Sequence, residues 1–596
     1  PVPQTLDELR AAINEVMEEH DVPAVGIAMV DETGPVLVDA WGKANVEEDT
    51  DANADSMFRI GSTSKMFVAL SVLKLVEEGR LSLDDRLADL APEVEFENPW
   101  EETHPVLLAH LLEHTTGWDD IHLPEYAHND PTPATLREGL DFHPHSRVSR
   151  WMPGSRSSYC NSGPPVAAYI VQKVTRQDFE EYVRQNFFEP MGMETMTYRL
   201  SDDVSKKGVT LYQGDTPQDY WHIVMRPSGS INASPVDMAK LASFFVNRGS
   251  VNGEQLISEA SLQRMEIAAT TAAGKAGQEA GYGLSNYSSR HKNWVYREHN
   301  GGVNGGLTEF SYLPEAHVGH AIMINSGAGA AYMEISDLVR DYETRNLVAP
   351  DVPAPTTIGP EHESIAGLYF PINPRQEIAR FIEQPLGLFR LWFEENELRV
   401  KPLLDSEVLT YVAASENLYR NMETGVIVMS RVDDPLAGPV VHVGSTVLKP
   451  TSAFAAYGQL AIAALWGLSI AISIPYALVW GVRRLRGKIP PGPSIRIRVW
   501  PLLAGLSVIA FIMLFSAGMG DPFSSLGKPT AISVGIMIMT IAFALLAALG
   551  LITSIRERGT EMNRVNYWFT TTSSLLHCII VAYLAWFGII GLTTWA

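Results

Sequence analysis

This chain of 596 residues has little basic charge and almost no cysteine. It carries 45 Lys and Arg against 69 Asp and Glu. Proteins that bind nucleic acid cluster Lys and Arg against the phosphates, so we expect no nucleic-acid partner. The two cysteines, Cys160 and Cys578, lie in a soluble region and in an apolar segment respectively. We therefore expect no disulfide framework.

Acidic residues are also scarce in residues 451–596, which hold only three of them. This part of the chain is apolar, and each of its four long apolar segments could cross a hydrocarbon core of about 30 Å as a helix. We predict four transmembrane helices with the lipid bilayer as partner. They are expected at about 455–481, 499–518, 529–553 and 571–592.

The loops between these segments differ in charge. Six Lys and Arg follow the first segment and three follow the third, whereas the loop after the second holds only Lys528 and Asp521. Basic loops stay in the cytoplasm. We therefore expect a multi-pass protein of the bacterial cytoplasmic (inner) membrane. Residues 1–450 and the C-terminus would lie on the periplasmic or extracellular side.

Residues 1–450 are strongly acidic, with 66 acids and 35 bases. One interpretation is a well-solvated surface, suited to a salty environment. The other is an acidic funnel for cationic substrates.

Residues 1–347 combine helical and strand patterns. Apolar spacing predicts helices at 5–19, 62–79, 105–113 and 332–345. Strands are predicted in a run ending at Val30 and at 36–41, 307–312 and 318–325. Helices at both ends, strands just inside them and helices between predict a mixed α+β fold.

A Pro-rich stretch at 348–355 is predicted to be a linker. In residues 356–450 short apolar runs alternate with turn residues, which predicts a small β-rich, barrel-like domain. The runs lie at 389–393, 397–400, 426–430 and 440–448.

The first candidate for chemistry is Ser62, which stands three residues before Lys65 at a predicted helix start. The two side chains then share one face of the helix. A lysine kept neutral by burial and by the helix N-terminus could take the proton of the serine hydroxyl. The spacing alone is weak, because it recurs at Ser71, Ser289 and Ser525.

Two further motifs follow. Tyr159 and Asn161 form a Tyr-x-Asn pattern, in which the phenol could shuttle a proton to a leaving group and the amide could hold a substrate. The alternative is a buried tyrosine with a satisfied hydroxyl. His299 precedes Gly301 and Gly302 at a predicted strand. A strand edge without bulk admits a substrate backbone, and His299 could supply a donor near the serine; the alternative is an ordinary turn.

The three motifs occur in this order within longer contexts. These are residues 58–67, 81–85, 111–117, 153–163 and 299–306. They resemble the serine β-lactamase-like superfamily, in the branch of class C β-lactamases, D-alanyl-D-alanine carboxypeptidases, D-aminopeptidases (peptidase family S12 type) and related esterases. The resemblance covers nearly all of residues 1–347 and implies an antiparallel sheet flanked by helices, with an all-helical region beside it.

The resemblance implies that Ser62 is the nucleophile, with Lys65 and Tyr159 as the other catalytic groups. Whether Lys65 or Tyr159 is the general base stays open. The backbone N–H groups of Ser62 and of the residue after Gly301 would form the oxyanion hole. The residues implied for substrate and oxyanion binding are Asn161, His299, Gly301 and Gly302. His299 stands where typical β-lactamases carry Lys, and is more like the D-peptidases.

The reaction implied is acyl transfer through Ser62. The substrate expected is a small peptide or amide containing a D-amino acid, or a prodrug-type acyl-D-residue, as in relatives with C-terminal transmembrane helices that trim such a motif during export. Alternatives are a carboxylesterase or β-lactamase of the same fold, a penicillin-binding sensor, or a non-catalytic scaffold. We expect no cofactor and no metal.

Overall fold

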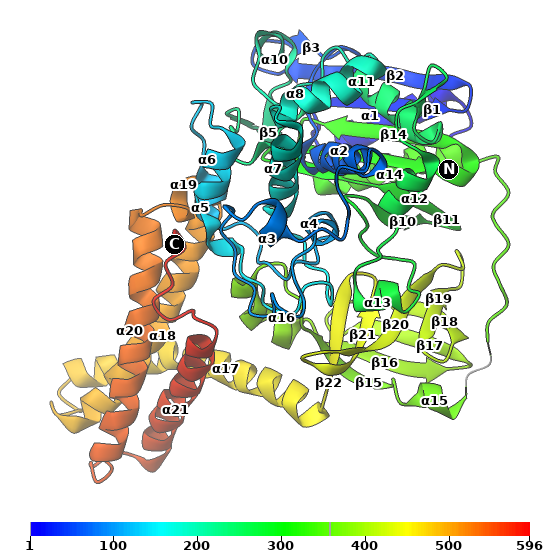
Figure 1. The fold of residues 1–596 in the computed structure, drawn as a ribbon. Coiled ribbons are helices and arrows are strands. Elements are labelled where there is room, and N and C mark those ends of the chain that lie inside the picture. The colour runs from blue at the N-terminus through cyan, green and yellow to red at the C-terminus, as the bar shows by residue number, and fades with distance from the viewer. Residues whose placement is uncertain (1, 357–358) are drawn as a thin grey trace.

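A computed structural model of the chain describes residues 2–356 and 359–596. Three parts follow one another along the chain (Figure 1). We call residues 2–347 the sheet region, residues 367–451 the barrel, and residues 453–586 the apolar helices. The barrel lies under one side of the sheet region, and the apolar helices extend from the other side.

The sheet region is built on one antiparallel sheet, in the order β10-β11-β13-β14-β1-β2-β3, with β12 paired to β13. β1 is buried on both faces, because its alternate side chains enter two different cores. The strands are β1 (Ala24–Asp31), β2 (Gly34–Asn45), β3 (Thr50–Asp51), β10 (Tyr287–His291), β11 (Trp294–Glu298), β12 (Gly301–Val303), β13 (Gly306–Leu313) and β14 (Val318–Ile324).

Helices cover both faces of this sheet. α1 (Leu6–Glu19) and α14 (Gly329–Thr344) pack on one face, and α11 (Pro235–Val246) packs on the other with α2 (Lys65–Glu77) behind it. The other helices are α3 (Leu87–Leu90), α4 (Leu108–Leu112), α5 (Leu123–Ala127), α6 (Leu136–Asp141), α7 (Gly163–Thr175), α8 (Phe179–Val183), α9 (Glu189–Met191), α10 (Asp202–Lys207), α12 (Glu259–Met265) and α13 (Ala272–Lys275).

The α+β fold expected from the sequence is confirmed. Three predicted helices differ from the structure. The helix predicted at 332–345 begins earlier, at Gly329, as α14. The helix predicted from Ser62 begins only at Lys65, because residues 61–64 form a tighter 3-10 turn, η1 (Gly61–Ser64), that starts at a glycine with φ +53°. The helix predicted at 105–113 is limited to α4.

The barrel is closed, with eight antiparallel strands in sequence order, as the alternating runs predicted. The run predicted at 440–448 is two strands, because Gly444 turns the chain with φ +56°. Two short helices, α15 (Pro360–Glu363) and α16 (Arg380–Leu386), accompany the barrel. The strands are β15 (Gly367–Pro371), β16 (Phe389–Glu394), β17 (Glu397–Pro402), β18 (Leu409–Ser415), β19 (Leu418–Asn421), β20 (Ile427–Asp434), β21 (Gly438–Val443) and β22 (Thr446–Thr451).

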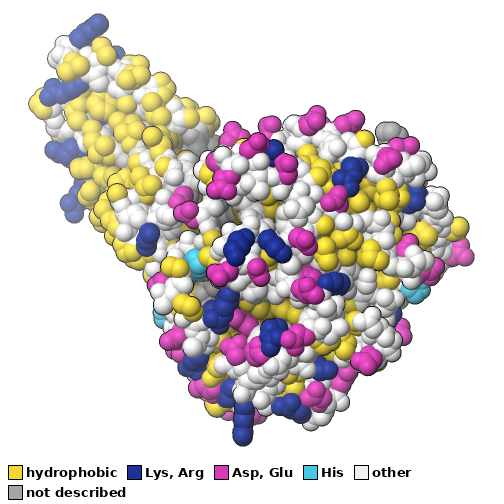
Figure 2. All heavy atoms as spheres, turned by 90° about the horizontal axis from the view of Figure 1, so that it is seen from above, with side chains coloured by type: hydrophobic (Ala, Val, Ile, Leu, Met, Phe, Trp, Pro, Cys, Tyr) yellow, Lys and Arg dark blue, Asp and Glu magenta, His cyan; other side chains and the backbone are white. Residues whose placement is uncertain are grey.

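Four of the apolar helices are long and apolar enough to cross a membrane. Their outer surface is mostly hydrophobic, with Lys and Arg at its edge, whereas acidic side chains are frequent on the rest of the molecule (Figure 2). The fourth helix lies earlier than predicted, and a short helix joins the second to the third. The helices are α17 (Ala453–Leu485), α18 (Pro493–Gly518), α19 (Pro522–Leu526), α20 (Ala531–Arg556) and α21 (Arg564–Trp586).

Candidate active site

Ser62 lies in η1, and its hydroxyl is bound by the lysine three residues later. Lys65 Nζ is 2.9 Å from Ser62 Oγ and 2.5 Å from the backbone O of Ser228. Lys65 is fully buried, and this burial lowers its pKa to about 7, with the nearby Arg375 acting in the same direction and Asp120 against it. At neutral pH a large fraction of Lys65 is therefore uncharged and able to accept the proton of Ser62.

Strand β12 packs directly against this turn, and only glycine allows it to come so close. A Cβ on Gly301 would lie 1.8 Å from the backbone O of Ile60, and a Cβ on Gly61 would lie 2.6 Å from the backbone N of Gly302. Thr63 Oγ1 fastens the two segments by donating to the backbone O of His299 at 2.9 Å. The backbone N–H groups of residues 62 and 302 are thus brought to one corner beside the serine hydroxyl.

Tyr159 lies against the same lysine, with Lys65 Nζ 5.1 Å from the centre of its ring. Burial raises the pKa of Tyr159 well above its ordinary value, although a hydrogen bond with Ser62 acts in the opposite direction. The ring of His114 packs 4.3 Å from that of Tyr159, centre to centre. Tyr159 is therefore a protonated phenol at neutral pH, suited to deliver a proton to a leaving group.

Asn161 is held by a buried carboxylate that the sequence did not reveal. Its Nδ2 donates to Asp120 Oδ1 at 3.1 Å and to the hydroxyl of Tyr126 at 3.2 Å. Its backbone N–H also donates to Asp120 Oδ1, at 2.8 Å. Because the amide nitrogen is committed to these contacts, the group that Asn161 can offer to a substrate is its carbonyl oxygen, an acceptor for an N–H.

His299 is buried, and both of its ring nitrogens are engaged. Nε2 lies 2.5 Å from the hydroxyl of Tyr282, and Nδ1 lies 2.8 Å from the backbone O of Asn300. Burial lowers the pKa of His299 to about 3, so the ring is neutral at physiological pH. Nδ1 then carries the proton that binds Asn300, and Nε2 accepts from Tyr282. His299 therefore positions Tyr282 and does not direct a donor at Ser62, in contrast to the expectation from the sequence.

Two cavities meet at Ser62. The larger, of about 870 Å³, lies between the sheet region and the barrel, and includes Tyr159, Tyr282 and His299 in its wall. The smaller, of about 210 Å³, is lined by Asn161 and by mainly apolar side chains. We call these the large cavity and the small cavity. Gly302 and Arg375 line both of them.

The barrel supplies Arg375, which the sequence did not point to. It lies in the loop after β15, and its Nε and Nη2 are both 2.7 Å from Asp120 Oδ2. Its guanidinium carbon is 4.7 Å from the ring centre of Tyr159. Burial opposes the charge of Arg375, but Asp120 outweighs it and raises the pKa of the guanidinium. A permanent cation from the barrel therefore faces the nucleophile.

The barrel loop is fixed in place by the segment that precedes Tyr159. Arg156 forms a buried, two-pronged ion pair with Asp434, at 2.6 and 2.7 Å, and also donates to the backbone O of Ile372 at 3.1 Å. Asn373 Nδ2 donates to the backbone O of Ser157 at 2.7 Å. Such bidentate pairs are geometrically specific, so the position of Arg375 over the site is well defined.

The motifs, the fold and the geometry of the site agree with the comparisons to known proteins. Residues 9–342 match the family model described as Beta-lactamase. The chain belongs to the beta-lactamase family. The serine hydrolase class and the β-lactamase-like fold expected from the sequence are thereby confirmed.

Two relatives within this family show how far the likeness extends. The chain is 26% identical over 364 residues to "Penicillin-binding protein 4" of Amycolatopsis lactamdurans, which covers 56% of this chain and 90% of that protein. It is 25% identical over 253 residues to "Protein flp" of Staphylococcus aureus (strain MW2), covering 40% of this chain and 49% of that protein. The chain thus spans nine-tenths of the first relative's length and about half of the second's.

One similar solved structure is D-amino acid amidase from Ochrobactrum anthropi SV3. The two sequences are 18% identical and the TM-score is 0.48. The match covers 57% of this chain and 100% of the amidase chain. A β-lactamase/D-alanine carboxypeptidase from Pseudomonas syringae is 17% identical, with a TM-score of 0.46. That match covers 57% of this chain and 98% of the carboxypeptidase chain.

Proposed function

We propose that this member of the beta-lactamase family is a serine amidase or peptidase that forms an acyl-enzyme on Ser62. The observation that carries the proposal is the buried Lys65, whose Nζ lies 2.9 Å from Ser62 Oγ and whose pKa is lowered to about 7. A serine is a weak nucleophile until a base of this kind accepts its proton. Because Tyr159 is protonated while Lys65 is close to neutral, we assign the role of base in acylation to Lys65.

The reaction follows from these assignments. Ser62 Oγ bonds to the carbonyl carbon while its proton moves to Lys65 Nζ. The backbone N–H groups of Ser62 and Gly302 donate to the oxyanion that forms, an interaction worth roughly 3–4 kcal/mol for one donor. The bond to the leaving nitrogen then breaks as Tyr159 delivers a proton to that nitrogen and is reprotonated from Lys65. Water hydrolyses the ester on Ser62 by the reverse route.

As substrate we propose a small peptide or amide that contains a D-residue, or a prodrug-type acyl-D-residue. The likeness to a penicillin-binding protein supports an amide as the scissile bond, because a penicillin acylates serine through its lactam amide. The neutral His299, in the place of the lysine of typical β-lactamases, supports the D-peptidase side of the family over β-lactam hydrolysis. Arg375 and Asn161 supply a cation and an N–H acceptor beside the scissile bond.

We also propose that the apolar helices anchor the enzyme in the bacterial cytoplasmic membrane, with the sheet region and the barrel on the periplasmic side. An ion pair joins Arg496, in the first turn of α18, to Glu557, directly after α20. The connection before α18 and the connection after α20 therefore lie at one end of the helices. The short helix α19 lies at the other end, against the sheet region. This arrangement obeys the preference of basic loops for the cytoplasm. The two connections at this end, 486–492 and 557–563, are too short to carry a signalling domain, which disfavours a sensor.

The test is the intact mass of detergent-purified, full-length protein after exposure to a fluorophosphonate and, separately, to a penicillin. We expect an adduct from each reagent that is absent in Ser62→Ala. The matched control is Ser71→Ala, which alters the second Ser-x-x-Lys pattern and should keep both adducts. A fluorophosphonate adduct without a penicillin adduct would favour the esterase alternative. Folded protein without any adduct would overturn the proposal.

A further inference from the structure

The small cavity beside Ser62 is bounded by an aromatic group that comes from the apolar helices. Phe523 lies in α19, between the second and third of the long helices, and lines this cavity. Its ring stacks on that of Tyr126, with centres 5.8 Å apart and an angle of 11° between the planes. It stacks equally on Trp221, at 5.3 Å and 21°. A residue more than 400 positions along the chain from the nucleophile therefore forms part of the same cavity.

Phe523 is held in this position by its own helix. Asp521 caps α19 by accepting from the backbone N–H of Ser524 at 3.1 Å. At the other end, Thr594 Oγ1 donates to the backbone O of Leu526 at 2.7 Å. Gly527 touches the sheet region so closely that an added Cβ would lie 2.7 Å from the backbone O of Leu123. The seat of α19 on the sheet region is thus fixed by backbone packing as well as by the stacked rings.

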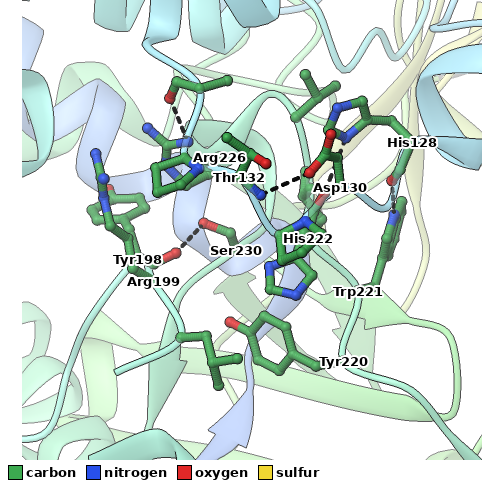
Figure 3. A pocket seen from close by; sticks show the side chains of 16 residues that line it. His128, Asp130, Thr132, Tyr198, Arg199, Tyr220, Trp221, His222, Arg226 and Ser230 are labelled. Carbon is green, nitrogen blue, oxygen red and sulfur yellow. Dashed lines mark hydrogen bonds between the residues drawn. The ribbon is translucent and has the colours of Figure 1, made fainter. Parts of the chain in front are cut away.

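Trp221, the partner of Phe523, is fixed from the opposite side. Its indole N–H donates to the backbone O of His128 at 3.1 Å, and the contact lies in a second, more polar cavity behind it (Figure 3). His128 and His222 lie around that second cavity, together with Arg226 (Figure 3). Trp221 therefore forms a wall between a polar cavity and the apolar small cavity, with its orientation set by a hydrogen bond.

The chemistry around Ser62 decides which part of a substrate enters the small cavity. Tyr159, which delivers the proton to the leaving group, lines the large cavity and not the small one. The leaving amine therefore belongs in the large cavity. The acyl side belongs in the small cavity, where Asn161 can accept from an N–H and Val303 of the β12 edge lies alongside.

The size and lining of the small cavity limit what the acyl side can be. A water molecule occupies ~30 Å³ in the liquid. The small cavity, of 210 Å³, therefore has room for about seven groups of the size of a water molecule. Polar groups in its wall include Asn161, Ser228, Arg375 and Glu125, of which Glu125 is tied to the backbone N–H of His122 at 2.7 Å. The rest of the wall is largely apolar. Beyond the three stacked aromatic residues, it includes Ile121, Ile223, Val224, Met225 and Val303.

We propose that Phe523 determines specificity: with Trp221 and Tyr126 it bounds a subsite for a compact apolar group, the size of a phenyl or branched aliphatic side chain, on the acyl side of the substrate. This inference rests on the proposed acylation of Ser62 and adds the substrate class. It also makes the apolar helices part of the substrate site, because α18 and α20 carry α19 between them. Long acyl chains exceed the room that Phe523 leaves.

The experiment uses full-length protein in detergent and p-nitrophenyl esters whose acyl groups are acetyl, phenylacetyl, octanoyl and dodecanoyl. We expect kcat/KM to be highest for phenylacetyl and at least about tenfold lower for dodecanoyl, since apolar pockets discriminate by such factors. Phe523→Ala should raise the dodecanoyl-to-phenylacetyl ratio by about tenfold, and Phe523→Trp should lower the phenylacetyl-to-acetyl ratio.

Phe515→Ala is the matched control, because Phe515 is an exposed phenylalanine of α18 that does not line the cavity. It should keep the wild-type ratios. Wild-type protein that hydrolyses no ester and takes no fluorophosphonate would refute the proposed function itself. Hydrolysis with the same chain-length profile in wild type, Phe523→Ala and Phe523→Trp would refute only the role of Phe523. Should Phe523→Ala not fold, Phe523→Leu takes its place, and an unchanged ratio there is equally decisive.

Discussion

Arg375 of the barrel and Asp120 of the sheet region lie 2.7 Å apart at the nucleophile. The carboxylate of Asp120 is fully buried and also binds the backbone and the side chain of Asn161. The two charges act on Lys65 in opposite directions, since Arg375 lowers its pKa and Asp120 raises it. Burial is the main cause of the lowered pKa of Lys65. Two charges from parts of the chain that lie 255 positions apart adjust it further.

The first prediction concerns the pH dependence of acylation. Lys65 accepts a proton only when neutral, and its pKa is lowered to about 7 by burial. The rate of fluorophosphonate labelling of Ser62 should therefore rise with pH and level off above about 7. The measurement is the rate of fluorophosphonate labelling between pH 5 and pH 9, and the reference is the ordinary pKa of a lysine side chain. A rate that is still rising steeply at pH 9, without levelling off, would show a lysine of ordinary pKa and contradict the assignment.

Replacing Arg375 should move this profile. In Arg375→Leu the cation that lowers the pKa of Lys65 is lost, while Asp120, which raises it, remains. The midpoint of labelling should shift to higher pH, and labelling at pH 7 should fall about twofold for a shift of half a unit. The control is Arg390→Leu, an exposed barrel arginine stacked on Trp392, which should leave the midpoint in place. An unchanged midpoint in Arg375→Leu would separate the barrel from the electrostatics of the site.

Gly301 should tolerate no side chain. In Gly301→Ala the Cβ would overlap the backbone O of Ile60, 1.8 Å away, and strand β12 must move off the nucleophile turn. This displaces the N–H of Gly302, and the loss of one oxyanion donor costs about 100- to 1,000-fold in rate. The effect is measured as the steady-state rate of ester hydrolysis, compared between variants that have the same melting temperature. Gly329→Ala is the control, because nothing lies within 4 Å of a Cβ there; equal rates in the two variants would exclude the close approach.

The sequence predicts those features that depend on local pattern. The spacing of Ser62 and Lys65 and the runs predicted as neighbouring strands at 307–312 and 318–325 are local, and the structure places them as expected. The start predicted for α2, at Ser62, was wrong by three residues, because the positive φ of Gly61 bends the chain into a 3-10 turn. Apolar periodicity cannot detect such a bend.

Other features depend on how distant segments meet. The Tyr282 hydroxyl engages Nε2 of His299, the side chain that was expected to supply a donor near the serine, and that contact follows from tertiary packing. Arg375 and Phe523 lie in a barrel loop and in a helix connection, outside every recognisable motif. Only the docking of the barrel and of α19 on the sheet region brings them to Ser62, and neither docking leaves a periodic pattern in the sequence.

Far from the nucleophile, His320 lies fully buried between two carboxylates. Its Nε2 is 2.9 Å from Glu309 Oε1, and its Nδ1 is 3.0 Å from Glu343 Oε2. Arg340 Nε binds the same oxygen of Glu309 at 3.0 Å. Burial disfavours the charged imidazole, but Glu343 and Glu309 outweigh it and raise the pKa of His320 to about 9. The imidazolium thus fastens α14 to strands β13 and β14.

The last prediction is that this imidazolium makes the sheet region less stable in alkali. Because the pKa of about 9 in the folded protein exceeds the ordinary 6.5, the contribution of His320 is complete below pH 6.5 and is lost as the pH rises through 9. A pKa shift of this size corresponds to a contribution to the free energy of unfolding on the order of 3 kcal/mol.

His320→Gln should lower the melting temperature at pH 6.5 by roughly 5–10 °C, and intrinsic fluorescence follows the unfolding. The difference from wild type should shrink at pH 9.5, while the exposed His104→Gln should match wild type at both pH values. A melting temperature of His320→Gln equal to that of wild type at pH 6.5 would contradict a stabilising imidazolium at this position.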